Sequence, residues 1–254
     1  PEPALKIAGF GQARVVVGDR MLRSGDWRSI TSRDLFFFLL CQGPATKDQL
    51  ANTFWPDLSP GKLRSTLHVT IYRLRRALDP LETVVFEDDR YHFNRRLNYV
   101  FDAEMFEKLL VQAGAVAAAN SARAIELYTQ ALDLFRGDFL EDYASGHDEW
   151  RVMRANELSE KYLEALDNVG SLLTQQQEHQ VALDIFKRAV SYDPYRESAR
   201  RGVMRSLVAL QRRVEALRHY NELERFLETE LGASPTAETE RLYHRILANE
   251  PLTD

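Results

Sequence analysis

The chain has 254 residues, of which 44% are hydrophobic and 28% charged, and its formal net charge is −5. These values are typical of a globular protein of about two domains and exclude a largely disordered chain. The single cysteine, Cys41, excludes a disulfide framework and a cysteine-based zinc finger. No apolar run reaches the roughly 18 residues that a transmembrane helix needs. We therefore expect a cytoplasmic protein without a membrane partner.

The net charge is divided unevenly along the chain. Residues 1–97 carry 15 basic and 11 acidic side chains, a segment charge of +4, and residues 98–254 carry 18 and 27, a segment charge of −9. A one-sided distribution of this kind indicates different partners for the two halves. The sequence therefore predicts two domains, residues 1–97 and residues 98–254, with a boundary near residues 95–102.

The first predicted elements are strands and a buried helix. Residues 5–30 favour strands, and Gly18-Asp19 can form the two-residue turn of a hairpin. Residues 32–42 predict a buried helix, and Gly43-Pro44 should end it.

Two further helices follow. Thr46 with Gln49 forms a capping-box pattern before a short helix. Ser59 is a good N-cap and Pro60 suits the first helical position, so a third helix should run to about Asp79.

A second hairpin completes the first half. Residues 83–87 and 90–94 favour strands around the turn Asp88-Asp89. A small sheet, three helices and a hairpin, in this order, are typical of a winged helix-turn-helix. Because the hairpin tip is acidic, either Arg90 reaches DNA while the acids face away, or this wing contributes little.

The third predicted helix has an apolar side and a basic side, since a helix turns about 100° per residue. Its apolar stripe, which should face the core, is Leu63, Leu67, Ile71, Leu74 and Leu78. The opposite side carries Lys62, Ser65, Val69, Tyr72, Arg73 and Arg76, flanked by Thr66 and His68, while Arg64 and Arg75 lie nearer the core edge. No acidic residue occurs between Pro60 and Leu78.

This mixture of side chains suits a helix that enters the major groove of DNA. Arginine can bind guanine edges, hydroxyls can bind phosphate, and valine can touch a thymine methyl group. Phosphate neutralisation by Lys and Arg would make the binding salt-dependent. The alternative is a solvated helix face, but such faces more often alternate Glu with Lys.

The second half contains a repeat of 34 residues, which is the length of a tetratricopeptide unit. Ala182, Phe186 and Ala189 recur as Ala216, Tyr220 and Leu223, and a partial third copy is Ala124, Tyr128 and Ala131. We predict that these residues form the core of a solenoid of helix pairs.

Signatures of an enzyme are absent. The chain has no glycine-rich phosphate loop, its six histidines show no metal-ligand spacing, and Cys41 lies in an apolar helix. We therefore expect no catalytic residue, no cofactor and no metal.

Two segments resemble a known family. Residues 55–78, WPDLSPGKLRSTLHVTIYRLRRAL, resemble the recognition-helix region of OmpR-type winged helices, most closely that of activators of the Streptomyces antibiotic regulatory protein type. Residues 98–250 resemble the bacterial transcriptional activator domain that follows in that family, with the markers FDAEMFEKLL, LFRGDFLED, SYDPYRESARR and ELGASPTAETERLYHRI. The resemblance implies a mainly α fold, in which an α+β winged helix with a three-stranded N-terminal sheet precedes a tetratricopeptide-like all-α solenoid.

The resemblance also implies contacts with DNA and with RNA polymerase. The family binds direct repeats near promoters, often as paired protomers, and recruits RNA polymerase through a loop that corresponds to Trp55–Ser59. By position, Val69 and Arg73 match residues that reach bases, whereas Thr66, Thr70, Tyr72 and Arg75 match residues that contact the DNA backbone.

We therefore predict a transcriptional activator that binds double-stranded DNA at promoter direct repeats and recruits RNA polymerase. A homodimer on tandem sites is left open. Because the chain does not begin with Met, a role as the output module of a larger signalling protein is also left open. Two alternatives also stay open: a tetratricopeptide protein-interaction adaptor and a ligand-sensing regulator. The predicted DNA-binding residues are Lys62, Arg64, Ser65, Thr66, Val69, Thr70, Tyr72, Arg73, Arg75, Arg76 and Arg90.

Overall fold

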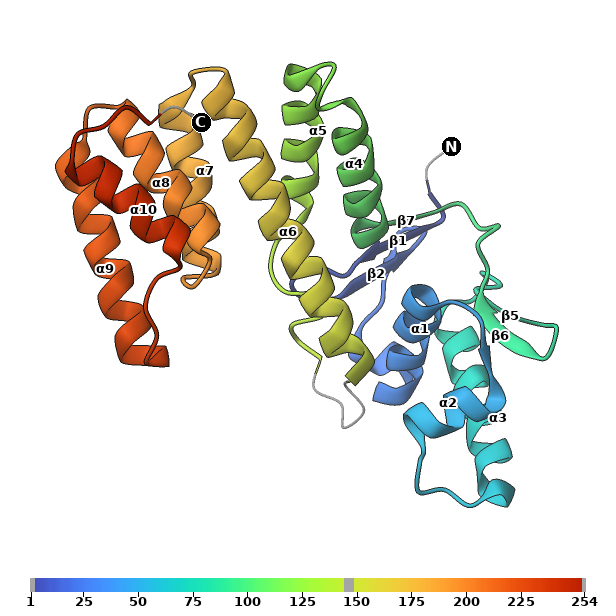
Figure 1. Ribbon diagram of the computed structural model, residues 1–254. Helices are drawn as coiled ribbons and strands as arrows, with labels where there is room; N and C mark the ends of the chain where they lie inside the picture. Colours follow the sequence, from blue (N-terminus) through green and yellow to red (C-terminus); the bar gives the residue numbers. More distant parts are fainter. Residues whose placement is uncertain (1–2, 144–148, 253–254) are drawn as a thin grey trace. The chain divides into compact units, whose positions relative to one another are not determined.

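A computed structural model describes residues 3–143 and 149–252 (Figure 1). Contacts within the chain divide it into two compact units. The first unit holds the described residues up to Met105 together with Leu134–Leu158, and the second holds Phe106–Asp133 and the described residues from Ser159 onward. These units are defined by contacts, so they do not test the division of the sequence into domains 1–97 and 98–254, which stays a prediction.

The first unit begins with a four-stranded sheet in the order β3-β2-β1-β7. As predicted, Gly18-Asp19 joins two antiparallel strands. The outermost strand β7 pairs in parallel with β1 and was not expected from the sequence, because its three residues show no alternation that marks a strand. The strands are β1 (Leu5–Ala8), β2 (Arg14–Val17), β3 (Arg20–Met21) and β7 (Tyr99–Phe101).

Three helices follow the first hairpin, as predicted. They are α1 (Ile30–Gln42), α2 (Lys47–Phe54) and α3 (Pro60–Ala77), and a short 3₁₀ turn, η1 (Ser24–Trp27), precedes them. The predicted capping box at the start of α2 is present, since Gln49 N donates to Thr46 Oγ1 at 3.2 Å and Thr46 N donates to Gln49 Oε1 at 2.9 Å. Ser59 occupies the N-cap position of α3, but its side chain makes no capping hydrogen bond.

The second predicted hairpin forms the wing. Its strands, β5 (Val84–Glu87) and β6 (Arg90–Phe93), are joined by a third, β4 (Ala45–Thr46), in the order β4-β6-β5. The turn residues Asp88 and Asp89 have φ values of 50° and 58°, as a two-residue hairpin turn requires.

Four aromatic side chains attach Leu134–Leu158 to the first unit. Phe135 lies 4.8 Å from the Phe10 ring centre, and the rings of Tyr143 and Trp150 lie 5.6 Å from two neighbouring phenylalanines of α1. A Cβ atom at Gly9 would lie 2.6 Å from the Phe139 ring, so only glycine fits where the chain passes this ring. These contacts explain why a segment from the helical half belongs to the first unit.

The described residues of the second unit form helices joined by turns and loops, as predicted. Its helix pairs follow the tetratricopeptide pattern, and the aligned residues Ala182, Phe186, Ala216 and Tyr220 are buried. The sequence missed two turns, in which Gln177 and Gln211 adopt positive φ values of 64° and 62° without a glycine to mark them. Three helices lie partly in each unit: α4 (Asp102–Val116), α5 (Ser121–Leu134) and α6 (Glu149–Gln175). The others lie wholly in the second unit: α7 (His179–Tyr192), α8 (Glu197–Ala209), α9 (Arg213–Leu231) and α10 (Ala237–Leu247).

Within the described ranges, none of the helices combines the length and the apolar character needed to cross a membrane.

Candidate nucleic-acid interface

Helix α3 packs into the core of the first unit through its apolar side. Leu67, Ile71, Leu74 and Leu78 of the predicted apolar stripe are buried, and α3 packs against α1, α2 and η1. At its C-terminal end, Arg20 Nη2 donates to the Ala77 carbonyl oxygen at 2.7 Å. A cation at this end of a helix interacts favourably with the helix dipole.

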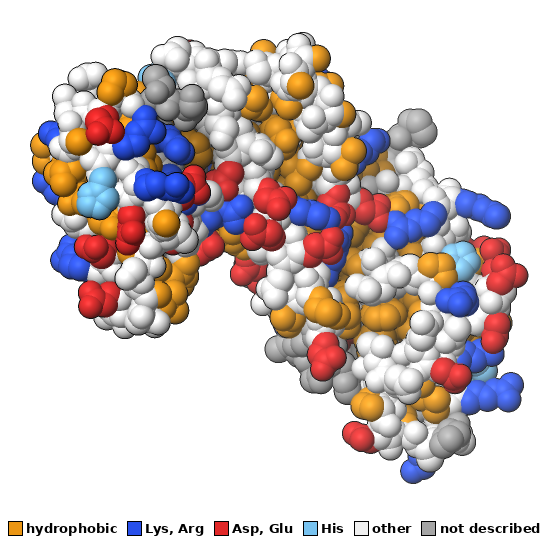
Figure 2. Space-filling model, viewed as in Figure 1, with side chains coloured by type: hydrophobic (Ala, Val, Ile, Leu, Met, Phe, Trp, Pro, Cys, Tyr) orange, Lys and Arg blue, Asp and Glu red, His pale blue; other side chains and the backbone are white. Residues whose placement is uncertain are grey.

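The other side of α3 is open to solvent. The side chain of Val69 is 46% exposed and that of Tyr72 is 64% exposed, so an apolar and an aromatic side chain lie among the basic residues of this side. Figure 2 shows Lys and Arg side chains on the surface of the first unit, at the lower right of the view. The exposed residues of α3 are Gly61, Lys62, Arg64, Ser65, His68, Val69, Tyr72, Arg73, Arg75 and Arg76.

Thr70, by contrast, is only 4% exposed. Its position three residues after Leu67 places it about 60° from the centre of the apolar stripe, just outside its edge. The Thr70 hydroxyl donates to the Thr66 carbonyl oxygen at 2.9 Å. The Thr70 side chain is therefore not accessible for the contact with the DNA backbone that the family resemblance implies.

Two other hydroxyls of α3 are engaged within the helix. Ser65 Oγ and Thr66 Oγ1 donate to the same acceptor, the Lys62 carbonyl oxygen, at 2.8 Å and 3.0 Å. Either hydroxyl could donate to a phosphate only after giving up this local bond, which is worth about 0.5–1.5 kcal/mol.

Arg75 is directed toward the wing. Its Nε and Nη2 atoms donate to the Val84 carbonyl oxygen at 3.2 Å and 2.9 Å. The sequence placed Arg75 near the core edge of α3 but contained no signal for this contact, since the two residues belong to different elements.

The wing tip combines an arginine with acids. Arg90 lies directly across from Glu87, so both side chains are on the same face of the hairpin. Glu87 also lies 3.6 Å from His92, and Asp89 lies 3.5 Å from the Lys47 amine. Acids therefore accompany Arg90 at the tip, which favours the expectation that this wing contributes little to phosphate binding.

The loop Trp55–Ser59 connects α2 to α3. The Trp55 ring is half-buried and lies 5.8 Å from that of Phe54, while Pro56, Asp57 and Ser59 are exposed. The loop thus presents a short accessible segment beside the N-terminal end of α3.

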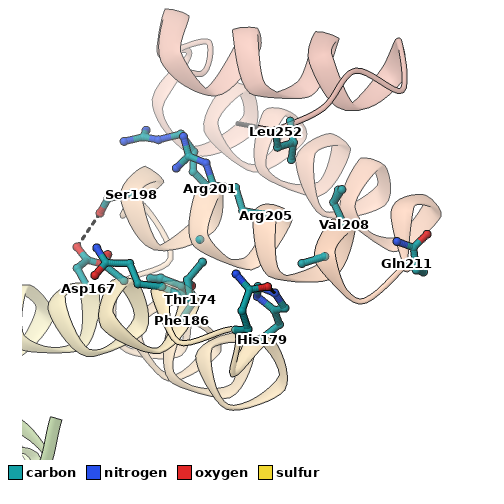
Figure 3. A pocket seen from close by; sticks show the side chains of 15 residues that line it. Asp167, Thr174, His179, Phe186, Ser198, Arg201, Arg205, Val208, Gln211 and Leu252 are labelled. Atoms are coloured by element: carbon teal, nitrogen blue, oxygen red, sulfur yellow. Dashed lines mark hydrogen bonds between the residues drawn. The ribbon is translucent and has the colours of Figure 1, made fainter. Parts of the chain in front are cut away.

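The second unit has a cavity of about 730 Å³ lined by α6, α7, α8 and Leu252 (Figure 3). Asp167, Thr174 and His179 lie on one side of it and Leu252 lies opposite (Figure 3). Asp167 Oδ2 accepts hydrogen bonds from Ser198 Oγ at 2.9 Å and from Arg196 Nε at 2.8 Å. No group of His, Cys, Asp and Glu side chains suited to a metal ion occurs in the described part of the chain.

Comparison with known proteins places the chain in a family. The model of the bacterial transcriptional activator domain matches residues 101–247. The transcriptional regulatory protein MoaR1 of Mycobacterium tuberculosis is 28% identical over 214 residues, covering 82% of this chain and 68% of MoaR1. The transcriptional regulator RedD of Streptomyces coelicolor is 31% identical over 152 residues, covering 59% of this chain and 43% of RedD.

A solved structure supports the fold of nearly the whole chain. Mycobacterium tuberculosis EmbR, in complex with a low-affinity phosphopeptide, has a TM-score of 0.81 at 21% identity, covering 99% of this chain and 67% of EmbR. The curated relatives are transcriptional regulators, in agreement with the expectation that the chain is not an enzyme. The chain belongs to the bacterial transcriptional activator domain family and is a transcriptional activator of the Streptomyces antibiotic regulatory protein type.

Proposed function

We propose that this activator binds double-stranded DNA by inserting α3 into the major groove. The observation that carries the proposal is the exposed side of α3, which has five basic residues and no acid while the opposite side is buried in the core. The exposed side chains of Val69 and Tyr72 add apolar contact area beside the arginines, which suits contact with thymine methyl groups.

The proposed contacts fall into two groups. Val69 and Arg73, in the middle of the exposed side, read bases, whereas Lys62, Arg64 and Arg76 supply charge for phosphates. Ser65, Thr66 and Tyr72 supply hydroxyl groups, and Arg90 adds only a weak contact from the wing, because Glu87 lies directly across from it. Thr70 is left out because it is buried.

We also propose that the activator binds direct repeats near promoters and recruits RNA polymerase through Trp55–Ser59. The exposure of this loop beside α3 supports the second part, because a protein bound through α3 would keep the loop accessible. A homodimer on tandem sites follows from direct repeats if each repeat takes one protomer.

Selection of bound sequences from a random DNA pool, followed by gel shifts at several salt concentrations, tests the proposal. We expect an enriched repeat and an affinity that falls as salt increases. Unchanged affinity in a folded Arg73→Ala, Arg76→Ala double variant would overturn the assignment of α3.

A ligand-sensing function is the second candidate. The cavity between α6 and α8 favours it, because its volume lies within the range of about 300–1,000 Å³ that is usual for small-molecule sites. A thermal-shift screen tests it, because a ligand that binds the folded state raises the melting temperature. The absence of any stabilising compound would count against it.

A further inference from the structure

The carbonyl oxygen of Val84 lies on the open edge of the wing. Asn94 N donates to the Thr83 carbonyl oxygen at 2.9 Å, so these two residues form a hydrogen-bonded pair of the β5–β6 ladder. Along antiparallel strands, hydrogen-bonded pairs alternate with pairs that are not hydrogen-bonded to each other. The next pair, Val84 with Phe93, is therefore of the second kind, and its carbonyl groups point away from the partner strand. Because β5 is the last strand of its sheet, no described strand donates a hydrogen bond to this carbonyl from the other side.

Arg75 fills this position. Val84 is completely buried, and a buried carbonyl without a partner would cost free energy. Two guanidinium nitrogens of Arg75 donate to it, and hydrogen bonds from a charged donor are stronger than neutral ones. The bond joins the C-terminal half of α3 directly to the base of the wing.

The opposite edge of the wing is held by a different element. Thr46 of β4 pairs with Arg90 of β6, and the next residue, Lys47, begins α2. The Lys47 amine lies 3.5 Å from Asp89 at the wing tip and 4.8 Å from the ring centre of Phe86. The wing is therefore held to α2 along one edge. Along the other edge, Arg75 is the only residue in the described part of the chain whose side chain bonds α3 to the wing.

We propose that Arg75 is a positioning residue, which fixes the angle between α3 and the wing, and that it does not act by neutralising a DNA phosphate. This inference rests on the proposed binding of DNA through α3. It replaces the backbone contact that the family resemblance implies for Arg75. With the bond intact, the base of the wing holds α3 at a fixed angle, so the basic side of α3 meets DNA preformed and the ordering cost on binding is small.

Two substitutions separate positioning from phosphate contact. Arg75→Lys keeps the charge but loses the two parallel N–H groups, and Arg75→Ala loses both. The matched control is Arg76→Ala, which removes an exposed arginine from the same turn and for which no bond to the wing is found in the described residues. Each variant is compared by melting temperature, by affinity for the selected DNA over a salt series, and by hydrogen exchange of the wing amides without DNA.

If Arg75 positions the wing, Arg75→Lys and Arg75→Ala both weaken binding at least about fivefold, with a wild-type salt slope and with faster exchange of the β5 and β6 amides. Arg76→Ala should instead lower the salt slope by about 0.9, the value expected for one phosphate contact, and leave the wing amides unchanged. Wild-type binding by Arg75→Lys, or a slope lowered by about 0.9 in Arg75→Ala, would overturn the proposal.

Failure of the proposed function has a different signature. If the wild-type protein binds no DNA in a salt-sensitive way, the DNA interface is wrong, and so is a positioning role for DNA. Hydrogen exchange of the wing amides in Arg75→Ala then tests separately whether the Arg75 bond holds the wing. Exchange at the wild-type rate would refute this structural role too.

Discussion

The ring of Phe186 lies against the backbone of Gly170, so closely that a Cβ atom on Gly170 would be 2.4 Å from the ring. Gly202 meets the same ring from α8, where a Cβ atom would be 2.5 Å away. Phe186 thus fills the space between α6 and α8 because both helices present a glycine. This contact holds consecutive helices of the solenoid together.

Gly170→Ala should lower the free energy of unfolding by about 1–3 kcal/mol, because the added methyl group overpacks a rigid site. Gly114→Ala is the matched control, since Gly114 is also helical and its Cβ atom would meet only the Tyr128 hydroxyl at 3.7 Å. There the better helix propensity of alanine should raise stability by up to about 1 kcal/mol. Urea unfolding of both variants measures the difference, and equal effects of the same sign would refute this account of Phe186.

The burial of Thr70 leads to a prediction about DNA. Thr70→Val should leave the affinity for DNA within about twofold of wild type, because the hydroxyl already donates to the Thr66 carbonyl and does not reach the surface. Stability should fall by about 0.5–1.5 kcal/mol, the usual worth of one hydrogen bond. The half-buried Thr66 is the control, and Thr66→Val should weaken binding. A large loss of affinity in Thr70→Val, with Thr66→Val unaffected, would contradict this assignment.

Arg73 stands in the middle of the exposed side of α3, where a base-reading residue is expected. Arg73→Ala should cost about 1–3 kcal/mol on the selected site and relax the preference at one base position. Lys62→Ala, at the start of the helix, should weaken all sequences alike and lower the salt slope by about one. Repeating the sequence selection with each variant distinguishes the roles, and an unaltered selected motif in Arg73→Ala would rule out base reading by this residue.

Local patterns predicted the elements better than their contacts. The Thr46–Gln49 capping box and the apolar stripe of α3 are read within one turn or one helix face, so sequence alone located them. The parallel strand β7 and the bond from Arg75 to Val84 depend on partners far away or in another element, and no local pattern encodes such a partner. For the same reason the packing of Leu134–Leu158 on the first unit could not be predicted.

The same limit applies to the candidate site. Helical spacing correctly separated the exposed residues of α3 from the buried ones at most positions. It did not exclude Thr70, because a residue about 60° from the centre of the stripe lies at the boundary between the buried and the exposed side. Only the positions of the neighbouring helices decide whether such a residue is buried. The ion pair between Lys47 and Asp89 at the wing tip likewise could not be predicted without the fold.

His219 of α9 should make the stability of the protein depend on pH. Burial, aided by the charges of Arg200 and Lys187, lowers its pKa from 6.5 to about 4, and among the described residues its Nε2 atom has no hydrogen-bond partner. In the unfolded chain the same group would titrate near 6.5. Between these two values the unfolded state binds more protons than the folded state, so stability rises with pH across this window. The contribution is complete above about pH 6.5 and is lost as the pH falls toward 4.

His219→Gln removes this titration and should flatten the dependence. The wild-type protein should lose at most about 3 kcal/mol more than the variant between pH 7 and pH 4, from about 1.4 kcal/mol for each unit of pKa shift. Urea unfolding at a series of pH values measures both proteins, and all other groups cancel in the difference. Parallel profiles for wild type and His219→Gln would show that His219 becomes protonated in the folded protein without penalty.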